Sequence, residues 1–591
     1  MSDDSLTPVP RQQHRLTIGG ALLVAIAAVP VLAIVLLVLR YSVPIPLLDD
    51  WEMVPIVTDA HEHHLTFGQL FEQQQEARTF FPKLFFLLFS VAKHWDSRVA
   101  MMFSVLICCL IALGIYRLLR YSGISSRASA VAILLALPLI FSPAQHELWL
   151  LASGFPSFIP ALCVVWGLCV LLGRASIAAK FWLCLGLAVL ASFSLPNGLL
   201  IWGLTFPAVF AMGAGRKELR WFGWWWLASA ICAVIYFWGF HSPQDLPPFA
   251  PSKPFTDYIK YLAAFLGSGL ARAGFANPLS SSIAVGIVVL TGYAGAIGHS
   301  IFRCRNAEYC RRVMPWLALA TYSIASGCLA ALGRIEWGVA QALESRYVAF
   351  SLYGVVGLIG FASVLCKDML AATPRRDLRA AIYGGIAITG GAYFTLYLVC
   401  AAASVASFQW RSAAARMGNG GVLFSQVLDT SKTIQAGNFP RPWQVQQRSA
   451  ALDRLHMLRT PLVRTTRISD LRHADLSGEP SGWLDGISVH EGKASAWGWA
   501  AAPSNDRPAD CVVLAYEDER GEWIAFALSN AVVPRPDVAR VLKNREQVWS
   551  GWSAEFPVAA VPKGARLSAW GLDAKAVKLY RLNTKDPSPS L

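Results

Sequence analysis

The chain has 591 residues, of which 55% are hydrophobic and 15% are charged. This composition excludes an ordinary soluble domain and predicts a polytopic membrane protein. The formal net charge of +14 does not indicate nucleic-acid binding, because the basic residues stand mostly in short loops between apolar segments. The 12 cysteines form no metal-binding pattern, and most lie inside apolar segments, where Cys acts as a small hydrophobic residue.

Eleven apolar segments are predicted to cross the membrane as helices, since one crossing needs about 20 apolar residues. The first segment is longer than the apolar core of a signal peptide and has no small-residue cleavage site before Arg40, so we expect it to remain as a span. The turn signal Pro196-Asn197-Gly198 favours a hairpin between two short segments over one long helix. The predicted spans are 17–39, 99–119, 127–141, 155–173, 181–195, 199–213, 221–240, 281–302, 313–333, 347–366 and 380–403.

Lys and Arg residues divide unequally between the loops on the two sides. The loops at 142–154 and 196–198 contain none, and the loops on the other side contain many. Because cytoplasmic loops are enriched in basic residues, we expect a bacterial inner-membrane protein with a cytoplasmic tail at 1–16 and a periplasmic C-terminal region. The basic residues of the cytoplasmic loops are Arg117, Arg120, Arg127, Arg174, Lys180, Arg216, Lys217, Arg220, Arg303, Arg305, Arg311, Arg312, Lys367, Arg375, Arg376 and Arg379.

The large first periplasmic loop, 40–98, concentrates the polar chemistry of the chain. Asp49 and Asp50 follow a Pro-rich exit from the first span, and His61, His64 and Arg78 follow downstream. A carboxylate pair at the mouth of a membrane helix can accept a proton, bind a divalent cation such as Mg or Mn, or do both. The alternative is that the carboxylates only cap the short helix that begins near Trp51. We expect one aspartate, preferably Asp50, to perform the chemistry and the other to orient the loop through His61, His64 or Arg78.

Two further periplasmic segments carry candidate substrate-binding residues. Residues 142–154 contain His146 and Glu147 beside Trp149, whose alternative role is anchoring at the membrane interface. Residues 334–346 place Arg334 and Arg346 at the two outer membrane boundaries, where basic residues are otherwise sparse. The planar guanidinium suits a lipid phosphate. The alternative for both arginines is pairing with a neighbouring Glu or snorkelling.

The rest of the chain is predicted to be less directly involved. Residues 257–275 read as an amphipathic helix on the membrane surface. A polar helical linker is expected at 406–481, followed by short alternating strands at 482–591 that predict a small β-sandwich accessory domain. That domain contains seven Trp, which we expect to form its core, although aromatic side chains also bind sugars. The seven are Trp483, Trp497, Trp499, Trp523, Trp549, Trp552 and Trp570.

The sequences PLLDDW, LTFGQLFEQQQEARTFFPKL and HWDSR in the first loop resemble a group of bacterial relatives within the GT-C superfamily of integral-membrane glycosyltransferases. The resemblance covers about residues 15–405. Relatives are expected to have a His-Arg pair where this chain has Ala77-Arg78. Arg78 matches that pair, but the histidine is missing, so the resemblance implies no catalytic histidine at this position. It implies sugar transfer from a polyprenyl-phosphate-linked donor to a cell-envelope glycan or lipid acceptor on the periplasmic side, with inversion and without a covalent enzyme intermediate.

Two other classes of function remain as alternatives. A transporter or flippase would have inverted repeats and ionisable residues in the middle of its spans, and the sequence has no clear repeat and few charges there. A non-catalytic envelope assembly protein would act through the C-terminal domain alone. Donor, acceptor and membrane lipids are the expected partners, and nucleic acid is not.

Overall fold

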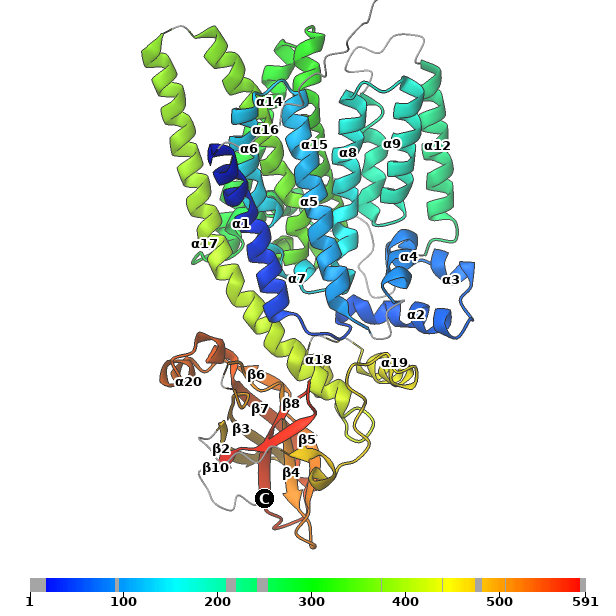
Figure 1. The fold of residues 1–591 in the computed structure, drawn as a ribbon, viewed down its shortest axis with the longest axis vertical. Coiled ribbons are helices and arrows are strands. Elements are labelled where there is room, and N and C mark those ends of the chain that lie inside the picture. The colour runs from blue at the N-terminus through cyan, green and yellow to red at the C-terminus, as the bar shows by residue number, and fades with distance from the viewer. Residues whose placement is uncertain are drawn as a thin grey trace, which may run out of the picture.

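The computed structural model of the chain describes residues 18–90, 95–208, 219–241, 253–373, 375–437, 439, 441–473, 481–504 and 506–584. A helical bundle occupies one end of the molecule and a β domain the other (Figure 1). Eight helical segments among the described residues are long and apolar enough to cross a membrane, which indicates a multi-pass membrane protein. The predicted tail at 1–16 and the basic residues Arg216 and Lys217 lie outside the described residues.

Helices occur within each of the eleven predicted spans, although the α-helix Ile201–Leu204 covers only four residues of the span 199–213. Three of them, α9, α10 and α12, are shorter or less apolar than the other eight. The predicted hairpin corresponds to α9, the 3-10 turn Pro196–Leu200 and α10. The helices of the bundle are α1 Ile18–Tyr41, α5 Ser97–Tyr121, α6 Ser126–Ile140, α8 Ile159–Leu172, α9 Ile177–Ser192, α10 Ile201–Leu204, α12 Leu219–Phe237, α13 Phe255–Ala271, α14 Pro278–Phe302, α15 Ala307–Arg334, α16 Val348–Ala372 and α17 Arg376–Leu423.

The two ends of the bundle differ in chemistry. The end nearest the β domain, here called the loop end, carries the short helices of the first loop: α2 Val54–His61, α3 Phe67–Phe71 and α4 Phe80–Phe89 (Figure 1). At the opposite end, Arg312 donates to both carboxylate oxygens of Asp368 at 2.7 and 3.0 Å. Arg311 there donates to the carbonyl of Leu172 at 3.1 Å. The loops predicted to be basic therefore gather at one end.

The β domain consists of two five-stranded sheets, with strand orders β1-β9-β8-β4-β5 and β10-β2-β3-β7-β6. One hydrophobic cluster contains Leu484 and Ala496 of the second sheet together with Val512 and Leu567 of the first, so the sheets pack face to face. The strands are β1 Arg472–His473, β2 Gly482–His490, β3 Lys493–Ala500, β4 Cys511–Glu517, β5 Trp523–Leu528, β6 Ala531–Val533, β7 Gly551–Pro557, β8 Leu567–Asp573, β9 Lys578–Arg581 and β10 Asn583–Thr584, with the helix α20 Pro536–Val541 between β6 and β7.

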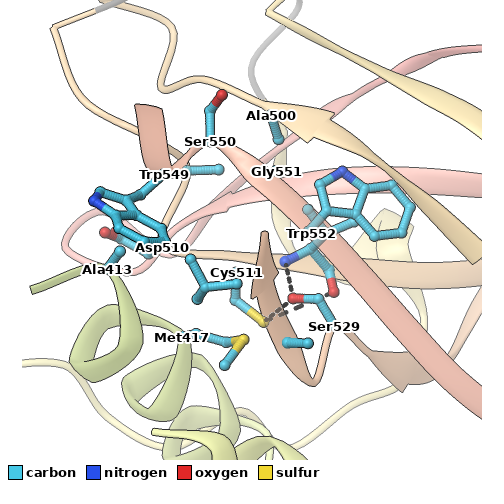
Figure 2. A pocket seen from close by; sticks show the side chains of 14 residues that line it. Ala413, Met417, Ala500, Asp510, Cys511, Ser529, Trp549, Ser550, Gly551 and Trp552 are labelled. Carbon is cyan, nitrogen blue, oxygen red and sulfur yellow. Dashed lines mark hydrogen bonds between the residues drawn. The ribbon is translucent and has the colours of Figure 1, made fainter. Parts of the chain in front are cut away.

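A single helix, α17, joins the bundle to the β domain. Its 48 residues extend for about 72 Å at 1.5 Å per residue, more than twice the roughly 30 Å hydrocarbon core of a bilayer. Met417 and Leu423 near its end share a hydrophobic cluster with Cys511 and Leu572 of the β domain, and Figure 2 shows this contact from close by. The predicted boundary at 405/406 therefore lies inside one continuous helix.

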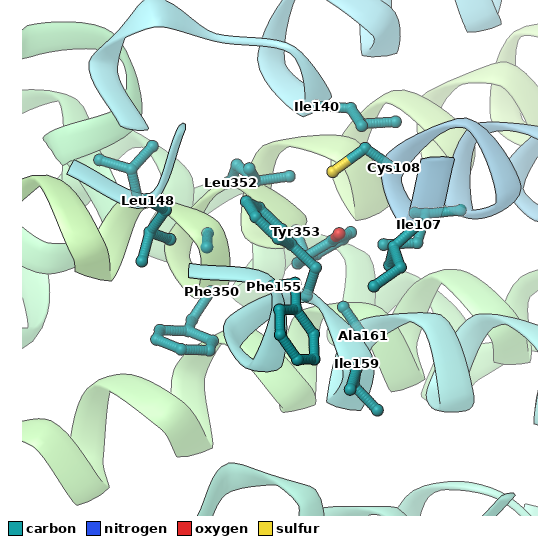
Figure 3. Packing of buried hydrophobic residues seen from close by; sticks show 14 of the residues in the cluster. Ile107, Cys108, Ile140, Leu148, Phe155, Ile159, Ala161, Phe350, Leu352 and Tyr353 are labelled. Atoms are coloured by element: carbon teal, nitrogen blue, oxygen red, sulfur yellow. The ribbon is translucent and has the colours of Figure 1, made fainter. Parts of the chain in front are cut away.

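Close packing in the bundle is shown around Tyr353 of α16, which is buried among α5, α6 and the segment 148–161 (Figure 3). Glycines permit an equally close approach between α13 and α14. A Cβ added at Gly267 would lie 1.9 Å from the Ser282 carbonyl, and one at Gly286 would lie 1.7 Å from the Ala263 carbonyl. The prediction that 257–275 lies on the membrane surface was wrong in this respect, because α13, which covers most of this segment, is buried against its neighbours.

The segment after α17 packs against the first loop. It contains α18 Ser431–Ala436 and α19 Pro442–Arg454. Phe439 makes an edge contact with Trp51, with ring centroids 6.0 Å apart, and Arg448 forms an ion pair with Glu52 at 3.0 Å. The predicted linker is thus an ordered brace on the loop that carries Asp49 and Asp50.

Candidate functional site

The chain leaves α1 through Pro44 and Pro46 and enters a 3-10 helix, Leu48–Met53, in which the two aspartates have different surroundings. Asp50 is 0% exposed. One of its carboxylate oxygens accepts the backbone N–H groups of Leu47 at 3.1 Å and Ala152 at 3.2 Å, and the other accepts that of Ser153 at 2.6 Å. Burial raises the pKa of Asp50 to about 6, against the effect of these hydrogen bonds. Both carboxylate oxygens of Asp50 therefore accept hydrogen bonds from the backbone.

Asp49 has the opposite situation, because its side chain is exposed. Protein nevertheless surrounds it closely enough that desolvation raises its pKa. The positive charge of Arg346 lowers the pKa of Asp49, and the negative charges of Glu147, Glu52 and Glu76 raise it further. The charges of Asp49, Arg346 and Glu147 are thus close enough to interact, and we call this group of residues the Asp49 recess.

The segment 142–154 supplies one side of this recess through α7, His146–Trp149. His146 and Glu147 are both buried. Arg411 of α17 lies 3.3 Å from the carboxylate of Glu147, and Arg272, which follows α13, lies 3.2 Å from Nε2 of His146. Because arginine can only donate, Nε2 accepts and the ring of His146 carries its proton on Nδ1.

The segment 334–347 supplies another side. The guanidinium of Arg346 lies 5.6 Å from the ring centroid of Tyr347, and the charges of Glu147 and Asp49 act on it. Arg334 forms an ion pair with Glu76 of the first loop and stacks over the ring of Trp337 at 5.1 Å. Glu336, a neighbouring acid in the same segment, lies 3.3 Å from Lys253. Arg334 therefore ties this segment to the first loop at the edge of the recess.

Some buried polar atoms of the recess and its neighbours have no hydrogen-bond partner among the described residues. Buried polar atoms in proteins are nearly always paired, so unpaired donors are what a site for a polar ligand provides. Arg346 Nε and Arg411 Nε offer donors for an anion, and Nδ1 of His146 offers a third.

Three predicted site residues lie away from this recess. Arg78 is buried and donates to the carbonyls of Tyr236 at 2.6 Å, Phe71 at 2.9 Å and Trp238, so it fastens the end of α12 to the first loop. His61 and His64 are exposed at the end of α2. Nδ1 of His61 lies 2.9 Å from the Val57 carbonyl. No contact of these three residues with either aspartate occurs among the described residues, so Asp50 is oriented by backbone N–H groups instead.

Sequence reasoning missed Arg272 and Arg411 as members of the recess. The signal was present, because both stand next to apolar helical sequence at the outer end of their segments, as Arg334 and Arg346 do. It also missed Glu52 and Glu76, the acidic partners of Arg448 and Arg334. Nothing in their spacing distinguishes these acids from solvated loop residues.

The predicted metal role of Asp49 and Asp50 was tested against the donor set. Among the described residues, no group of three or more His, Cys, Asp or Glu side chains is arranged to hold a metal ion. Both oxygens of Asp50 already accept backbone N–H groups. The two adjacent carboxylates therefore do not fit as a shared pair of metal ligands.

A cavity lies between α17 and the β domain (Figure 2). Sγ of Cys511 lies 3.3 Å from Oγ of Ser529 at its wall, and burial raises the pKa of this thiol to about 11. A thiol with this pKa is protonated at neutral pH and is not an activated nucleophile. Asp510 beside it pairs with Arg507 at 2.5 Å and with Arg416 at 3.9 Å. These contacts are structural and join α17 to the domain.

Comparisons with known protein families, curated proteins and solved structures gave no match to this chain. Its function therefore has to be argued from the residues and their geometry.

Proposed function

We propose that this protein is an integral-membrane glycosyltransferase that transfers a sugar from a polyprenyl-phosphate-linked donor to a cell-envelope glycan or lipid acceptor. The observation that carries the proposal is the Asp49 recess, where an exposed carboxylate shares its electrostatic surroundings with Arg346 and Glu147. Three segments far apart in the sequence meet there at the loop end of the bundle. A lipid-linked donor needs this location, because its phosphate lies at the membrane surface.

The chemistry requires a base and a site for phosphate. An acceptor hydroxyl loses a proton as it attacks the anomeric carbon, and the Asp49 carboxylate accepts that proton. The bond between the sugar and the lipid phosphate breaks, and the phosphate leaves with the bonding electrons. Arg346 and Arg411 offer donors to its growing negative charge. A single displacement of this kind inverts the anomeric centre.

The two aspartates exchange the roles that the sequence suggested. Asp50 positions the 3-10 helix through three backbone N–H groups, and Asp49 acts on substrate. Glu147 holds Arg411 in place and lies close enough to influence Asp49. No step of the proposed reaction passes through a metal ion.

The same proposal includes the finer architecture. We place eleven crossings in a GT-C-like bundle, with the loop end in the periplasm and the basic end in the cytoplasm of a bacterial inner membrane. The distribution of basic residues supports this orientation. The two sheets, which include β1 at Arg472–His473, form a periplasmic β-sandwich that serves as an accessory domain.

The test is transfer by the purified protein in detergent from a panel of synthetic polyprenyl-phosphate sugars to a short acceptor, with and without EDTA. In single turnovers, Asp49→Asn should transfer about 100- to 10,000-fold more slowly than wild type. Asp59→Asn is the matched control, because Asp59 in the same loop binds Gln69 at 2.6 Å and not the recess.

The pH profile gives a second readout from the same assay. The base acts when ionised, so the rate should fall as the pH drops through the raised pKa of Asp49, above the ordinary value of about 3.9. Wild-type rates in Asp49→Asn would eliminate Asp49 as the base. Absence of transfer from every donor, combined with donor-independent movement of lipid-linked sugar across a vesicle membrane, would favour the flippase alternative.

A further inference from the structure

Strand β3 of the β domain reverses the usual placement of large and small side chains. Its inward-facing residues are Ala494, Ala496 and Ala500, which are almost fully buried. Its outward-facing residues include Trp497, which is 41% exposed, and Trp499, which is half-buried. Large aromatic side chains normally lie in the core, and their removal from water contributes most to stability. The placement of alanine on the core face of β3 and of tryptophan on its outer face indicates that the outer face has a function.

The Trp497 ring lies beside the neighbouring strand β2. Trp497 pairs with Gly486 of β2 across the antiparallel ladder. Three consecutive ring atoms, Cε2, Cζ2 and Cη2, lie 3.2 Å or less from the position that a Cβ of Gly486 would occupy. The glycine thus leaves room for the indole next to β2, and Trp497 remains partly exposed there.

Polar side chains frame this ring at strand spacing. Ser553 of β7 is its partner on the other side, and Ser495 lies two residues earlier on the same strand. On the Trp499 side, the Cγ of Arg535 lies 2.6 Å from the position of a Cβ on Gly551 of β7. Its guanidinium reaches Asp485 of β2 at 2.7 Å. Because β3 lies between β2 and β7, the Arg535 side chain crosses β3 and closes the platform at that end.

We propose that this outer face, here called the Trp497 platform, binds a glycan. A sugar ring has an apolar C–H face that stacks on an indole and a rim of hydroxyls that need hydrogen-bond partners. The platform offers both, through Trp497 and through the hydroxyls of Ser495 and Ser553 with the charged groups of Arg535 and Asp485. A bilayer surface is a poor ligand for this face, because the face carries charged and hydroxyl groups beside its aromatic ring.

The platform's position suits a glycan chain and not a lipid-linked donor. The β domain lies beyond the loop end of the bundle, at the far end of α17 (Figure 1). Glycan binding stands independently of the proposed transfer chemistry, because none of the residues of the platform belongs to the recess.

The experiment measures binding of soluble glycans to the full-length protein in detergent by isothermal titration calorimetry. The probes are a β-glucan, an arabinan, a galactan, a mannan and an oligomer of N-acetylglucosamine. At least one should bind, and Trp497→Ala should bind it at least about 10-fold more weakly, since truncating a central aromatic contact costs at least that much. Trp497→Phe keeps an aromatic face and should retain part of the affinity.

Trp443→Ala is the matched control, because Trp443 on α19 is 63% exposed but lies on another surface. It should bind as wild type does. The proposal is overturned if no glycan binds, if Trp497→Ala binds normally, or if both alanine variants lose affinity equally. Self-association that disappears in Trp497→Ala by light scattering would assign the face to a second copy instead. Failure here is distinct from failure of the transferase proposal, because Asp49→Asn should still bind the glycan and Trp497→Ala should still transfer to a short acceptor.

Discussion

Substitution of Asp50 by Asn should change the pH dependence of stability in a direction that the structure sets. The carboxyl of Asp50 is fully buried, and its pKa rises from an ordinary 3.8 to about 6 on folding. Because the folded-state pKa is the higher one, protonation stabilises the folded protein. That contribution is fully present below pH 3.8 and is lost as the pH rises through about 6.

The magnitude follows from the two pKa values. A group whose pKa moves from 3.8 to about 6 on folding contributes at most roughly 3 kcal/mol to the free energy of unfolding. About 1.4 kcal/mol of this is present at pH 5 and almost none at pH 8. Asn cannot titrate. It also leaves one of the three backbone N–H groups facing an amide donor, which costs roughly 1–3 kcal/mol independently of pH. The free energy of unfolding of wild type, relative to that of Asp50→Asn, should therefore rise by about 1.4 kcal/mol as the pH falls from 8 to 5.

The assay is thermal unfolding of the detergent-purified proteins at pH 5 and pH 8, followed by intrinsic tryptophan fluorescence from the 22 Trp residues. The Tm difference between wild type and Asp50→Asn should be about 1–3 °C larger at pH 5. Asp537→Asn is the control, because Arg535 holds the pKa of Asp537 at about 2, outside this pH window. An equal difference at both pH values for Asp50→Asn would refute the reasoning, since the buried carboxyl would then not titrate between them.

Two further substitutions test the recess and the bundle. Arg346→Lys keeps the charge but loses the two-pronged guanidinium, so the KM for the lipid-linked donor should rise about 10-fold, and Arg346→Ala should be worse; unchanged donor kinetics in both variants would remove Arg346 from phosphate binding. Gly286→Ala should lower the Tm strongly or prevent folding, because its Cβ would lie 1.7 Å from the Ala263 carbonyl, whereas Gly295→Ala on the same helix meets open space. Equal Tm values for the two glycine variants would contradict the close packing of α13 on α14.

The sequence predicted the membrane helices and the three segments that meet at the loop end, because hydropathy and the distribution of basic residues are local properties. It could not distinguish Asp49 from Asp50. Their directions depend on the backbone N–H groups of Ala152 and Ser153, about 100 residues away. The burial of α13 likewise depends on a glycine in each of two helices, and an amphipathic pattern alone does not reveal which surface covers its apolar face.

The aromatic residues of the β domain show a different kind of limit. The alternation in KASAWGWAAA predicts a strand with two faces, and the burial rule assigns the tryptophans to the core. Among them Trp552 is buried, but Trp497 and Trp499 lie on the outer face. The alanines on the inner face of β3 leave space that Trp552 and Phe556 of β7 fill within the same cluster. The large side chains of β7 therefore decide which face of β3 lies in the core.

Asp50 and its partners explain how the recess can keep its geometry without a ligand. Asp50 ties the first loop to Ala152 and Ser153. The backbone N–H of Glu147 in that same segment donates to Oγ of Ser345 at 3.2 Å, and Ser345 in turn donates to the carbonyl of Ala144 at 2.7 Å. These bonds fix Asp49, Glu147 and Arg346 relative to one another through buried groups that do not face the recess. A site held by its supporting hydrogen bonds needs little reorganisation when charge develops on a bound group, which is the advantage that the proposed transfer reaction would need.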